Sequence, residues 1–566
     1  MTFNNINNYN NYNSSYKSDS DNNSSNGNNK TVAIIGFGPA GICSTKSCIE
    51  NGLIPTAFEM SSDLGGVWSK SNGKVWDNLT TNVTRYTMSF SDFLNEEPND
   101  EPYNNGEKDI YPHHSSIYNY LNKYTNHFNL IKHVKFNSKV IKVEKVYFTN
   151  DNFKLKVTWK SSRNGEYKDD NIGSSIKSEI FDFLIVCTGV FLEAQECDLY
   201  ENELKNFKGK IIHSKDYKNN NNLIGKRIVV LGSSISGCEI SSEVSKVTSK
   251  CFHVGHEINY VYNKHLPDKN NRLAPLDCVI YQRKDAYERQ DLPRDEFLKI
   301  KNKLNKKFCP KQDIDEYPNS KIAISPESKT LGFVISSEYV NQVENGSISV
   351  FCGNQYTISS SSGKSVTFSN FIGENHTVDN IDEIIICNGY KTDLSFFEKS
   401  ILDTLDYKPS DTKRPILLYR NTFAKDLKNI GFASFFRGLF FCEMELMTRW
   451  MCLVFSGKHP YPNKYQYKNG IKDRNFKINF ENVPQFLIAG STTHCDFVAL
   501  EIGVLPDFEK LKKTDPKLYD LLWNGYFTPA TYRLVGPGSN PKLAKEIIEK
   551  VNNNFNNYVN KINKNC

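Results

Sequence analysis

The stretch TVAIIGFGPAGICSTKSCI, residues 31–49, decides the fold. It opens with a β-branched apolar run that predicts a buried strand, passes through three spaced glycines, and ends in apolar residues at helical spacing. In such a unit Gly36 permits the tight turn, Gly38 lets the backbone approach a pyrophosphate, and Gly41 lets the helix pack closely on the strand. The amino terminus of the helix offers unpaired N–H groups to the phosphates. The pattern predicts a dinucleotide site whose candidate binding residues are Gly36, Gly38, Pro39, Ala40 and Gly41.

A second strand, LIPTAFEM, supplies the acidic residue of such a site. It reaches Glu59 roughly 20 residues beyond the turn, where a carboxylate accepts hydrogen bonds from both ribose hydroxyls. The phrase DLGGVWSK follows, and because FAD-type Rossmann domains often continue in this way, we interpret the first site as one for FAD rather than NAD. The candidate residues of this phrase are Gly65, Gly66, Val67 and Trp68. Two alternatives stay open: a chance glycine-rich turn with Glu59 on the surface, and a tight turn anchored by a buried Trp68.

A second glycine turn lies in KRIVVLGSSISGCEISSEV, residues 226–244, again between an apolar strand and a helix. Ser234 replaces the middle glycine of the motif, and its hydroxyl can donate a hydrogen bond to a phosphate oxygen. We expect this turn to bind a second dinucleotide, and its candidate residues are Gly232, Ser233, Ser234, Ile235, Ser236 and Gly237. The alternative is a Rossmann unit that is purely structural and binds nothing.

The second unit does not show a clear cation for a 2′-phosphate. An NADPH site places Arg or Lys after its second strand, which we assign to KCFHVG, residues 250–255. Counting along the chain puts that position near His256, with Glu257 beside it. Four other cations could supply the charge from a neighbouring loop, although each is more often a solvated surface residue: Lys250, Lys264, Arg272 and Arg283. We expect NADPH rather than NADH.

Composition excludes several classes of function. A chain of 566 residues exceeds the size of a single core and predicts several domains. The balance of 70 basic against 64 acidic residues gives +6, too small and dispersed for a nucleic-acid surface, so we expect no nucleic-acid partner. The 14 cysteines show neither a C-x-x-C pair nor zinc spacing, and no apolar signal segment begins the chain. We therefore expect a reduced, cytoplasmic protein without a metal site.

The longest apolar passage, IGFASFFRGLFFCEMELMTRWMCLVF, spans residues 430–455. Four charged residues interrupt it, namely Arg437, Glu443, Glu445 and Arg449. It therefore fails the criterion of about 20 apolar residues for a membrane-spanning helix. We expect no transmembrane segment and leave open that this passage lies against a membrane surface such as the endoplasmic reticulum. Arg449, on an apolar helix, is expected either to be buried with a carbonyl or carboxylate partner or to lie near the cofactor, and we assign it no catalytic role.

Two further strands indicate how the domains are connected. FDFLIVCTGVF ends at Thr188-Gly189 and DNIDEIIICNGYKTD ends at Gly389-Tyr390, which fits two crossings between a split domain and an inserted one. We expect an α/β fold of two Rossmann-like dinucleotide-binding domains, with the NADPH domain inserted into the FAD domain. The predicted division is an Asn/Ser-rich disordered tail (1–29), an FAD-binding domain (30–208 and 383–550), an NADPH-binding domain (209–382) and a polar tail (551–566).

Taken in order, these motifs resemble the flavin-containing monooxygenases, which are class B flavoprotein monooxygenases. FKGKIIHSKDY, residues 207–217, matches the family fingerprint F-x-G-x-x-x-H-x-x-x-Y, with His213 and Tyr217 at its last two fixed positions. NLTTNVTRYTMSFSDF is similar to the family's L-x-T-N segment and SDF run, and ELMTRWMCLVFSG and FTPATYRLVGPG are similar to its R-W helix and its Y-R-L-x-G-P-G phrase. Related Baeyer–Villiger enzymes typically have Trp at the fingerprint's last position, so Tyr217 favours the N- or S-oxidising branch.

The resemblance implies an FAD-dependent NADPH monooxygenase of the N,N-dimethylaniline monooxygenase type. Such an enzyme uses molecular oxygen, forms a C4a-hydroperoxyflavin, and oxygenates soft nitrogen or sulfur atoms of small amines or thioethers. The resemblance places Thr81 and Asn82 next to the cofactor and makes Asn82 the catalytic candidate, while His213 and Tyr217 lie between the nucleotide domains. Asn82 could instead be a turn former, and His213 and Tyr217 could be purely structural. The sequence does not indicate an oligomeric state.

Departures from the family pattern fall mainly in the second site. Ser234, Ile235 and His256 stand where the family has Gly, often Asn and commonly Arg, and Asn388 replaces a Thr in ICNGY. Two other functions stay open: an FAD-dependent NAD(P)H oxidase that produces hydrogen peroxide, and a nonenzymatic dinucleotide-binding protein. A pyridine-nucleotide disulfide reductase needs a redox cysteine pair beside the flavin, and Cys43 and Cys48 are more simply packing residues of the first helix.

Overall fold

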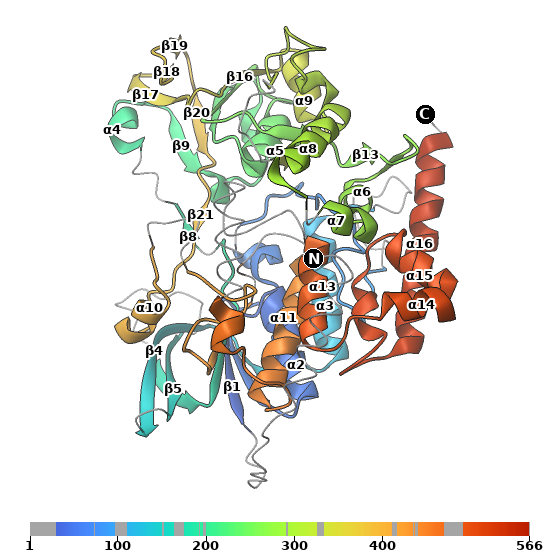
Figure 1. Ribbon diagram of the computed structural model, residues 1–566. Helices are drawn as coiled ribbons and strands as arrows, with labels where there is room; N and C mark the ends of the chain where they lie inside the picture. The colour runs from blue at the N-terminus through green and yellow to red at the C-terminus, as the bar shows by residue number, and fades with distance from the viewer. Residues whose placement is uncertain are drawn as a thin grey trace.

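Two five-stranded parallel sheets form the two halves of the molecule (Figure 1). The computed structural model describes residues 30–72, 74–96, 110–149, 152–162, 175–191, 193–195, 200–289, 292–324, 333–409, 416–433, 435, 440–468 and 491–564. The predicted disordered tail, residues 1–29, lies outside these residues. The first sheet has the order β22-β7-β1-β2-β3 and the second has the order β16-β11-β10-β20-β9.

The two sheets are built on one plan. The first contains β1 (Thr31–Ile35), β2 (Ile54–Phe58), β3 (Val134–Lys135), β7 (Phe183–Val186) and β22 (Ile430–Phe432). The second contains β9 (Lys210–His213), β10 (Arg227–Leu231), β11 (Lys250–Gly255), β16 (Ile348–Cys352) and β20 (Glu383–Ile386). Every strand of the second sheet falls between β7 and β22 in the chain, so the second Rossmann-like unit is inserted into the first. The predicted fold class is confirmed.

Each sheet is covered on both faces, which explains why its strands are continuous apolar runs. On the first sheet, α2 (Pro39–Glu50) and α11 (Phe440–Phe455) pack on one face and an antiparallel meander packs on the other. The meander consists of β4 (Ser138–Thr149), β5 (Asn152–Ser161) and β6 (Ser175–Phe181). On the second sheet, one face is covered by α5 (Ile235–Val244) and α9 (Tyr339–Glu344). The opposite face is covered by a meander of β17 (Thr357–Ser362), β18 (Ser365–Ser369) and β19 (Asn375–Val378).

One two-stranded antiparallel ribbon connects the halves (Figure 1). Its strands are β8 (Glu193–Ala194), which follows β7, and β21 (Tyr390–Lys391), which follows β20. The sequence division assigns residues 383–550 to the first domain, yet β20 is hydrogen-bonded between β10 and β9 of the second sheet. The predicted boundary at residue 382 therefore comes one strand too early, and we place the return crossing after Ile386.

A long segment between β11 and β16 lies beside both halves. Its elements are β12 (Tyr260–Tyr262), β13 (His265–Pro267), β14 (Leu273–Pro275), α6 (Leu276–Ile280), α7 (Arg283–Arg289), α8 (Arg294–Phe308) and β15 (Phe333–Ile335). The remaining α-helices are α3 (His114–His127), α4 (Glu201–Leu204), α10 (Lys399–Thr404), α13 (Ser491–Glu501), α14 (Phe508–Thr514), α15 (Pro516–Trp523) and α16 (Pro541–Lys564).

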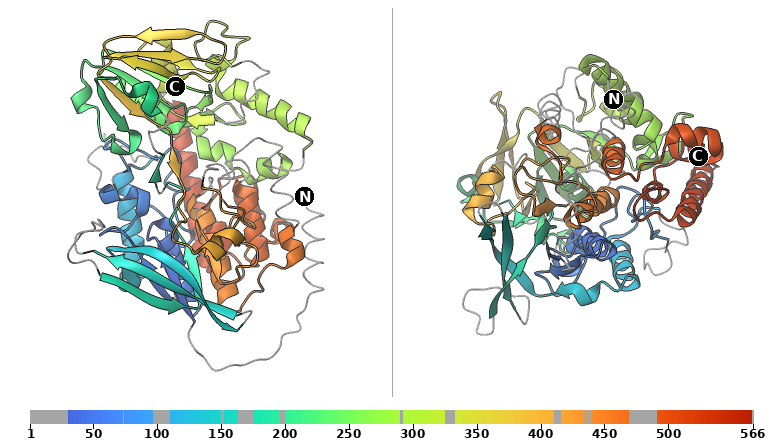
Figure 2. Two further views of the ribbon diagram at one scale, coloured as in Figure 1. Left: turned by 90° about the vertical axis from the view of Figure 1, so that its left-hand side faces the viewer. Right: turned by 60° about the horizontal axis from the view of Figure 1, so that its bottom comes forward.

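The carboxyl-terminal residues correct a second prediction. Residues 551–566 are predicted to be a polar tail, but through Lys564 they continue helix α16, which runs along one side of both halves (Figures 1 and 2). Val551, Phe555 and Val559 are buried and recur every four residues, which is helical spacing. Asparagine-rich intervening positions hid this apolar stripe, because asparagine is typical of loops and tails.

The long apolar passage forms part of the core. Its described helix, α11, packs against α2 and α13, with Met447 and Trp450 fully buried. This helix therefore cannot lie against a membrane surface. Among the helices that the structure describes, none is both long enough and apolar enough to cross a membrane.

Candidate active site

The first glycine turn joins β1 to α2 in a conformation that only glycine tolerates. Gly36 has φ of +97°, and a Cβ atom there would lie 2.6 Å from the carbonyl oxygen of Cys187. A Cβ at Gly41 would lie 2.0 Å from the carbonyl oxygen of Gly36. Gly38 caps α2 without a side-chain hydrogen bond, and Pro39 and Ala40 begin the helix. The first-turn N–H groups therefore point from an uncapped helix end toward the turn, as an anion site requires.

The GG phrase lies directly against this turn. Gly65 donates its N–H to the carbonyl oxygen of Phe37 at 3.0 Å. A Cβ at Gly66 would lie 3.0 Å from Cα of Gly38, so the two backbones meet without side chains between them. Gly66 opens a short 3₁₀ helix with Val67 and Trp68, both half-buried. The backbone of both turns is therefore free of side chains at their contact, which is the arrangement that lets a pyrophosphate approach the turn closely.

Glu59 directly follows β2 and is buried beside the turn. Its Oε2 accepts a hydrogen bond from the Phe37 N–H at 2.8 Å, and its Oε1 accepts from the Ser61 N–H at 2.9 Å and hydroxyl at 2.7 Å. The carboxylate is thus fixed in orientation. A carboxylate oxygen has two lone pairs, so Oε2 keeps one acceptor site for a ribose hydroxyl.

The second glycine turn repeats the first. Gly232 has φ of +116°, and a Cβ there would lie 2.4 Å from the carbonyl oxygen of Cys387. At Gly237 a Cβ would lie 1.6 Å from the carbonyl oxygen of Gly232. Ser234 has φ of −83° and ψ of −173°, close to the −76° and −168° of Gly38, and neither value requires glycine. The serine therefore leaves the turn undistorted. Ser233, Ile235 and Ser236 complete the turn and the first turn of α5.

A buried histidine on the neighbouring strand is hydrogen-bonded to the second glycine turn. His253 on β11 donates from Nε2 to the carbonyl oxygen of Gly232 at 3.0 Å, and its Nδ1 accepts from the hydroxyl of Tyr339 at 2.6 Å. Both nitrogens are engaged in the neutral form. Burial lowers the pKa of His253 to about 4.

Strand register shows which residue of the second unit corresponds to Glu59. The N–H of Gly36 bonds to the carbonyl of Phe58, and the N–H of Gly232 bonds to the carbonyl of Val254. Glu59 therefore corresponds to Gly255, and the predicted contact residue His256 corresponds to Met60. A Cβ at Gly255 would lie 2.6 Å from Cβ of Ser233, so no carboxylate occupies this position.

The next residues, His256 and Glu257, are exposed. The four alternative cations are engaged elsewhere. Arg283 is a buried partner of Asp496 at 2.8 Å, Arg272 pairs with Asp268 at 2.9 Å, Lys264 donates to Thr80 at 2.7 Å, and Lys250 donates to the carbonyl of Gly346 at 2.9 Å. Arg283 in particular is not the surface cation that the sequence suggested.

The fingerprint residues lie where the two halves meet. Nδ1 of His213 accepts from the Lys215 N–H at 3.0 Å, so Nε2 carries the proton and donates to Oδ1 of Asn388 at 2.9 Å. Asn388 follows β20 and is one of the departures from the family pattern. Burial lowers the pKa of His213. The ring of Tyr390 contacts His213 edge-on at 5.6 Å. His213 thus fixes the return crossing to the second sheet.

Tyr217 joins the second unit to the segment that precedes Asn82. Its ring lies 6.5 Å from that of Trp76, and burial, followed by the neighbouring Glu243, raises the pKa of its hydroxyl. Beside this contact, Asp77 donates its N–H to the carbonyl of Lys218 at 2.7 Å and accepts from Nδ2 of Asn219 at 2.8 Å. These bonds hold residues 75–78 against the second unit.

Asn82 lies between two threonines whose backbone or side chain is hydrogen-bonded, Thr81 before it and Thr84 after it. Thr81 is buried, with its N–H bonded to the carbonyl of Pro112 at 2.9 Å and its hydroxyl to the carbonyl of Val83 at 2.7 Å. Asn82 itself is half-buried, and its amide forms no hydrogen bond within the described part of the chain. A held backbone with a free amide is the arrangement expected of a group that meets a ligand.

Comparisons with known proteins bear directly on these two nested units. A family model described as flavin-binding monooxygenase-like matches residues 29–564. The chain belongs to this family. It is 30% identical to dimethylaniline monooxygenase [N-oxide-forming] 2 of Macaca mulatta and to flavin-containing monooxygenase 2 of Homo sapiens. Both matches cover 90% of this chain and 89% of the relative.

Solved structures share the fold of this flavin-binding monooxygenase-like chain. S-allyl-L-cysteine S-oxygenase from Allium sativum aligns with a TM-score of 0.55 at 18% identity, covering 87% of this chain and 94% of that one. Cyclohexanone monooxygenase from Rhodococcus sp. Phi1 aligns with a TM-score of 0.56 at 16% identity, covering 83% and 96%. At these identities the likeness shows the fold alone.

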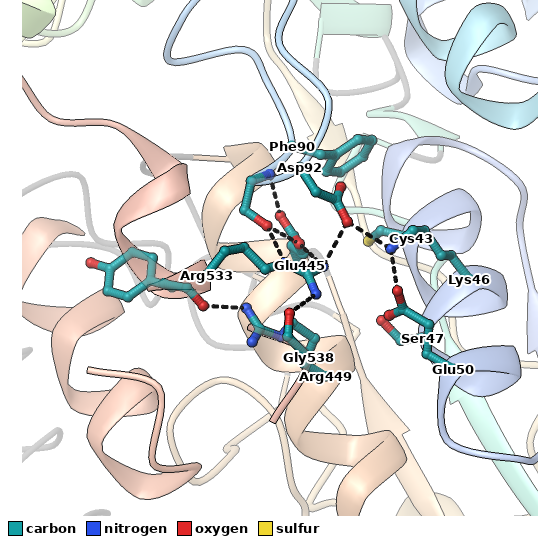
Figure 3. A network of polar contacts seen from close by, with 12 residues as sticks. Cys43, Lys46, Ser47, Glu50, Phe90, Asp92, Glu445, Arg449, Arg533 and Gly538 are labelled. Carbon is teal, nitrogen blue, oxygen red and sulfur yellow. Dashed lines mark hydrogen bonds and ion pairs between the residues drawn. The ribbon is translucent and has the colours of Figure 1, made fainter. Parts of the chain in front are cut away.

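The late motifs of the monooxygenase converge on one buried polar network (Figure 3). Arg533 pairs with Glu445 at 2.7 Å and with Asp92 at 3.0 Å, and Asp92 also pairs with Lys46 at 2.8 Å. The SDF run, the R-W helix and the Y-R-L-x-G-P-G phrase therefore meet against α2, the helix of the first glycine turn. Arg449 donates to the carbonyls of Tyr532 at 3.0 Å and Pro537 at 2.9 Å, which confirms its expected buried, carbonyl-bonded role.

The cysteines of α2 are packing residues. Cys43 and Cys48 are fully buried, and burial raises the pKa of Cys43 well above its usual value of 9.0. Cys48 contacts Cys452 of α11, with 3.5 Å between the sulfur atoms. Both cysteines pack between helices rather than facing the first glycine turn as a redox pair, which disfavours the disulfide reductase alternative.

Sequence reasoning missed two residues of the site. Lys74 is half-buried and donates to the carbonyl of Phe191 at 2.5 Å, and burial lowers its pKa to about 8. Asp277 of α6 is buried and accepts three hydrogen bonds from the segment that follows Asn82. Neither residue belongs to a local pattern, and only their long-range contacts identify them.

Proposed function

We propose that this monooxygenase uses NADPH and O₂ to oxygenate soft nitrogen or sulfur nucleophiles of small molecules, such as tertiary amines and thioethers. One oxygen atom enters the substrate as an N-oxide or S-oxide, and the other leaves as water with the two electrons of NADPH. The observation that carries the proposal is the pair of matching glycine turns in two nested parallel sheets, each followed by an uncapped helix.

The first unit is the candidate FAD site. The α2 amino terminus and the facing Gly66 would receive the pyrophosphate, and Glu59 would accept from the ribose. When bound, the reduced flavin supplies the reaction with O₂ and the transfer of one oxygen atom. The chain itself supplies the position of the cofactor, because backbone groups and the buried Glu59 carboxylate line the turn.

The second unit is the candidate NADPH site. Gly255 replaces the carboxylate that Glu59 provides in the first unit, which removes an acceptor for a 2′-hydroxyl and a charge that would repel a 2′-phosphate. This asymmetry between two otherwise matching turns supports NADPH at the second site. His256 and Glu257 are the exposed residues that follow this position.

The amide of Asn82 is the candidate catalytic group. It has both a donor and an acceptor, so it can orient the oxygen-bearing reactant by two hydrogen bonds without taking up a proton. We predict that Asn82→Ala retains FAD and is still bleached by NADPH, but releases about tenfold more hydrogen peroxide per NADPH in the presence of substrate. Asn126→Ala, an exposed asparagine on α3, is the matched control. Unchanged coupling in Asn82→Ala would remove the assignment.

An anaerobic titration tests the whole proposal. Purified protein should be yellow, should be bleached by NADPH, and on admission of air should consume one O₂ per NADPH with little peroxide when a trialkylamine or thioether is present. Complete conversion of NADPH to peroxide with every substrate would support the NAD(P)H oxidase instead. Yellow protein that neither NADPH nor NADH bleaches would support a nonenzymatic binding protein.

A further inference from the structure

The segment that carries Asn82 is bonded to residues 110–114 of the first unit and also to the segment inserted between β11 and β16. Oδ2 of Asp277 accepts from the Thr84 N–H at 2.9 Å, from the Thr84 hydroxyl at 2.7 Å and from the Thr87 hydroxyl at 2.6 Å. Asp277 belongs to α6, in the segment inserted between β11 and β16. One buried carboxylate therefore fixes three donors of the segment just after Asn82.

A second anchor lies on the other side of Asn82. Nζ of Lys264 donates to the Thr80 hydroxyl at 2.7 Å. Lys264 and Asp277 stand at the two ends of the β13–β14 hairpin, and the Leu276 N–H closes it by donating to the carbonyl of Lys264 at 2.8 Å. Asn82 is thus bracketed by two charged residues of one hairpin.

The hairpin is itself fixed in place. The side chain of Asn563, in α16, accepts from the Leu273 N–H at 2.9 Å and donates to the Leu273 carbonyl at 2.8 Å. His265 contacts Tyr558 of the same helix at 2.9 Å. Because the hairpin is held by a long helix, its two charged residues can fix the position of the Asn82 segment.

A structural role alone is a weak explanation for Asp277. Burial raises its pKa, because the carboxylate is almost completely removed from water, and the three accepted hydrogen bonds only partly offset this. Within the described part of the chain no cation pairs with Asp277, and burying such a carboxylate costs more free energy than bonding the threonine hydroxyls to backbone groups would. This free-energy cost is explained if the buried carboxylate is needed to fix the position of the segment that carries Asn82.

We propose that Asp277 and Lys264 are positioning residues that set the place of the Asn82 amide from the inserted segment between β11 and β16. The inference rests on the proposed function of Asn82. Because both anchors stand at the ends of the β13–β14 hairpin, a shift of this hairpin moves the Asn82 segment with it.

Hydrogen exchange of the FAD-bound enzyme tests the anchor without any turnover. In Asp277→Ala we expect exchange of peptides covering residues 79–90 to rise about tenfold or more, since the lost bonds are charge-assisted. Asp277→Asn keeps an acceptor oxygen and should restore most of the protection. Asp403→Asn, an exposed carboxylate of α10 that pairs with Lys399, is the control. If Asp277→Ala is too unstable to purify, Thr84→Val and Lys264→Met carry the same expectation on either side of Asn82.

Steady-state kinetics then separate positioning from folding. The anchor variants should keep FAD content and the midpoint of NADPH bleaching, and should lower kcat on a trialkylamine with KM nearly unchanged while peroxide release rises. Unchanged exchange in residues 79–90, or lower thermal stability with unchanged coupling, would overturn the inference. If the wild-type protein fails to oxidise NADPH, the proposed function fails, and the exchange experiment still decides whether the anchors hold the segment.

Discussion

Arg533 is the residue whose removal tests the buried network most directly. Its guanidinium uses Nε for the Ser91 hydroxyl at 2.7 Å, Nη1 for the Gly538 carbonyl at 2.9 Å, and Nη2 for Glu445 at 2.7 Å and Asp92 at 3.0 Å. Burial by itself would lower the pKa of Arg533. The neighbouring Glu445 and Asp92 outweigh burial and raise this pKa above its usual value, so the residue is charged.

The magnitude follows from the ion pairs that are lost. Arg533 is the cation that pairs with the carboxylates of both Glu445 and Asp92, whereas Lys46 pairs with Asp92 and with the exposed Glu50. Arg533→Met therefore leaves the buried carboxylate of Glu445 without this partner, although Ser91 still bonds it and Lys46 still pairs with Asp92. Removing one partner of a buried pair typically costs about 3–5 kcal/mol, and we expect a loss of that size.

The assay is urea unfolding followed by circular dichroism at fixed protein and FAD concentration, because bound ligand shifts apparent stability. The double variant Arg533→Met/Glu445→Gln should lose about 1–3 kcal/mol less than the sum of the single variants, because it removes both charges of the pair. Lys517→Ala breaks an exposed pair with Glu549 at 2.8 Å and should cost less than about 1 kcal/mol. A loss below about 1 kcal/mol in Arg533→Met, or strict additivity in the double variant, would refute the reasoning.

Two further predictions concern the second unit. His256→Arg should lower the dissociation constant of NADP⁺ about tenfold and leave that of NAD⁺ unchanged, because Arg can bind the 2′-phosphate that NAD⁺ lacks. Calorimetry on the FAD-bound protein measures both constants. An equal gain in affinity for both nucleotides would contradict this prediction. His253 is neutral in the fold, with a pKa of about 4 against an ordinary 6.5, so its stabilisation is present above pH 6.5 and lost as pH falls toward 4. The loss should approach about 3 kcal/mol at about 1.36 kcal/mol per pKa unit. The stability difference between wild type and His253→Gln should therefore shrink on acidification; a difference independent of pH would exclude His253 as its source.

The sequence predicts the parts of the fold that local conformation decides. Gly36 and Gly232 both need positive φ, and Gly41 and Gly237 both need the absence of a Cβ, so glycine spacing alone locates the two turns. Long apolar strands likewise indicate sheets covered on both faces, and the strand endings indicate the two crossings. These rules act within a few residues, which is why a single sequence reveals them.

The parts that failed depend on register or on distant partners. The sequence could not show that Gly255, next to the predicted contact residue His256, takes the place of Glu59 in the second unit, because only the pairing of β11 with β10 fixes which residue lies beside the turn. Arg283 reads as a surface cation until Asp496, more than 200 residues away, is placed beside it. Asp277 has no local signal at all, since its partners Thr84 and Thr87 lie in another unit.

The contacts of residues 75–87 explain why the family fingerprint and the Asn82 segment belong together. Asp77 is bonded to Lys218, directly after the fingerprint, while Thr80, Thr84 and Thr87 are bonded to the hairpin anchors of the inserted segment. This stretch is therefore bonded to the second unit at Asp77, to the inserted segment at the three threonines, and to residues 110–114 of the first unit. The Asn82 segment thus connects the two units directly, in addition to the ribbon formed by β8 and β21. A group at the candidate catalytic position is thus mechanically linked to the candidate nicotinamide site, which makes the fingerprint a coupling element rather than a spacer.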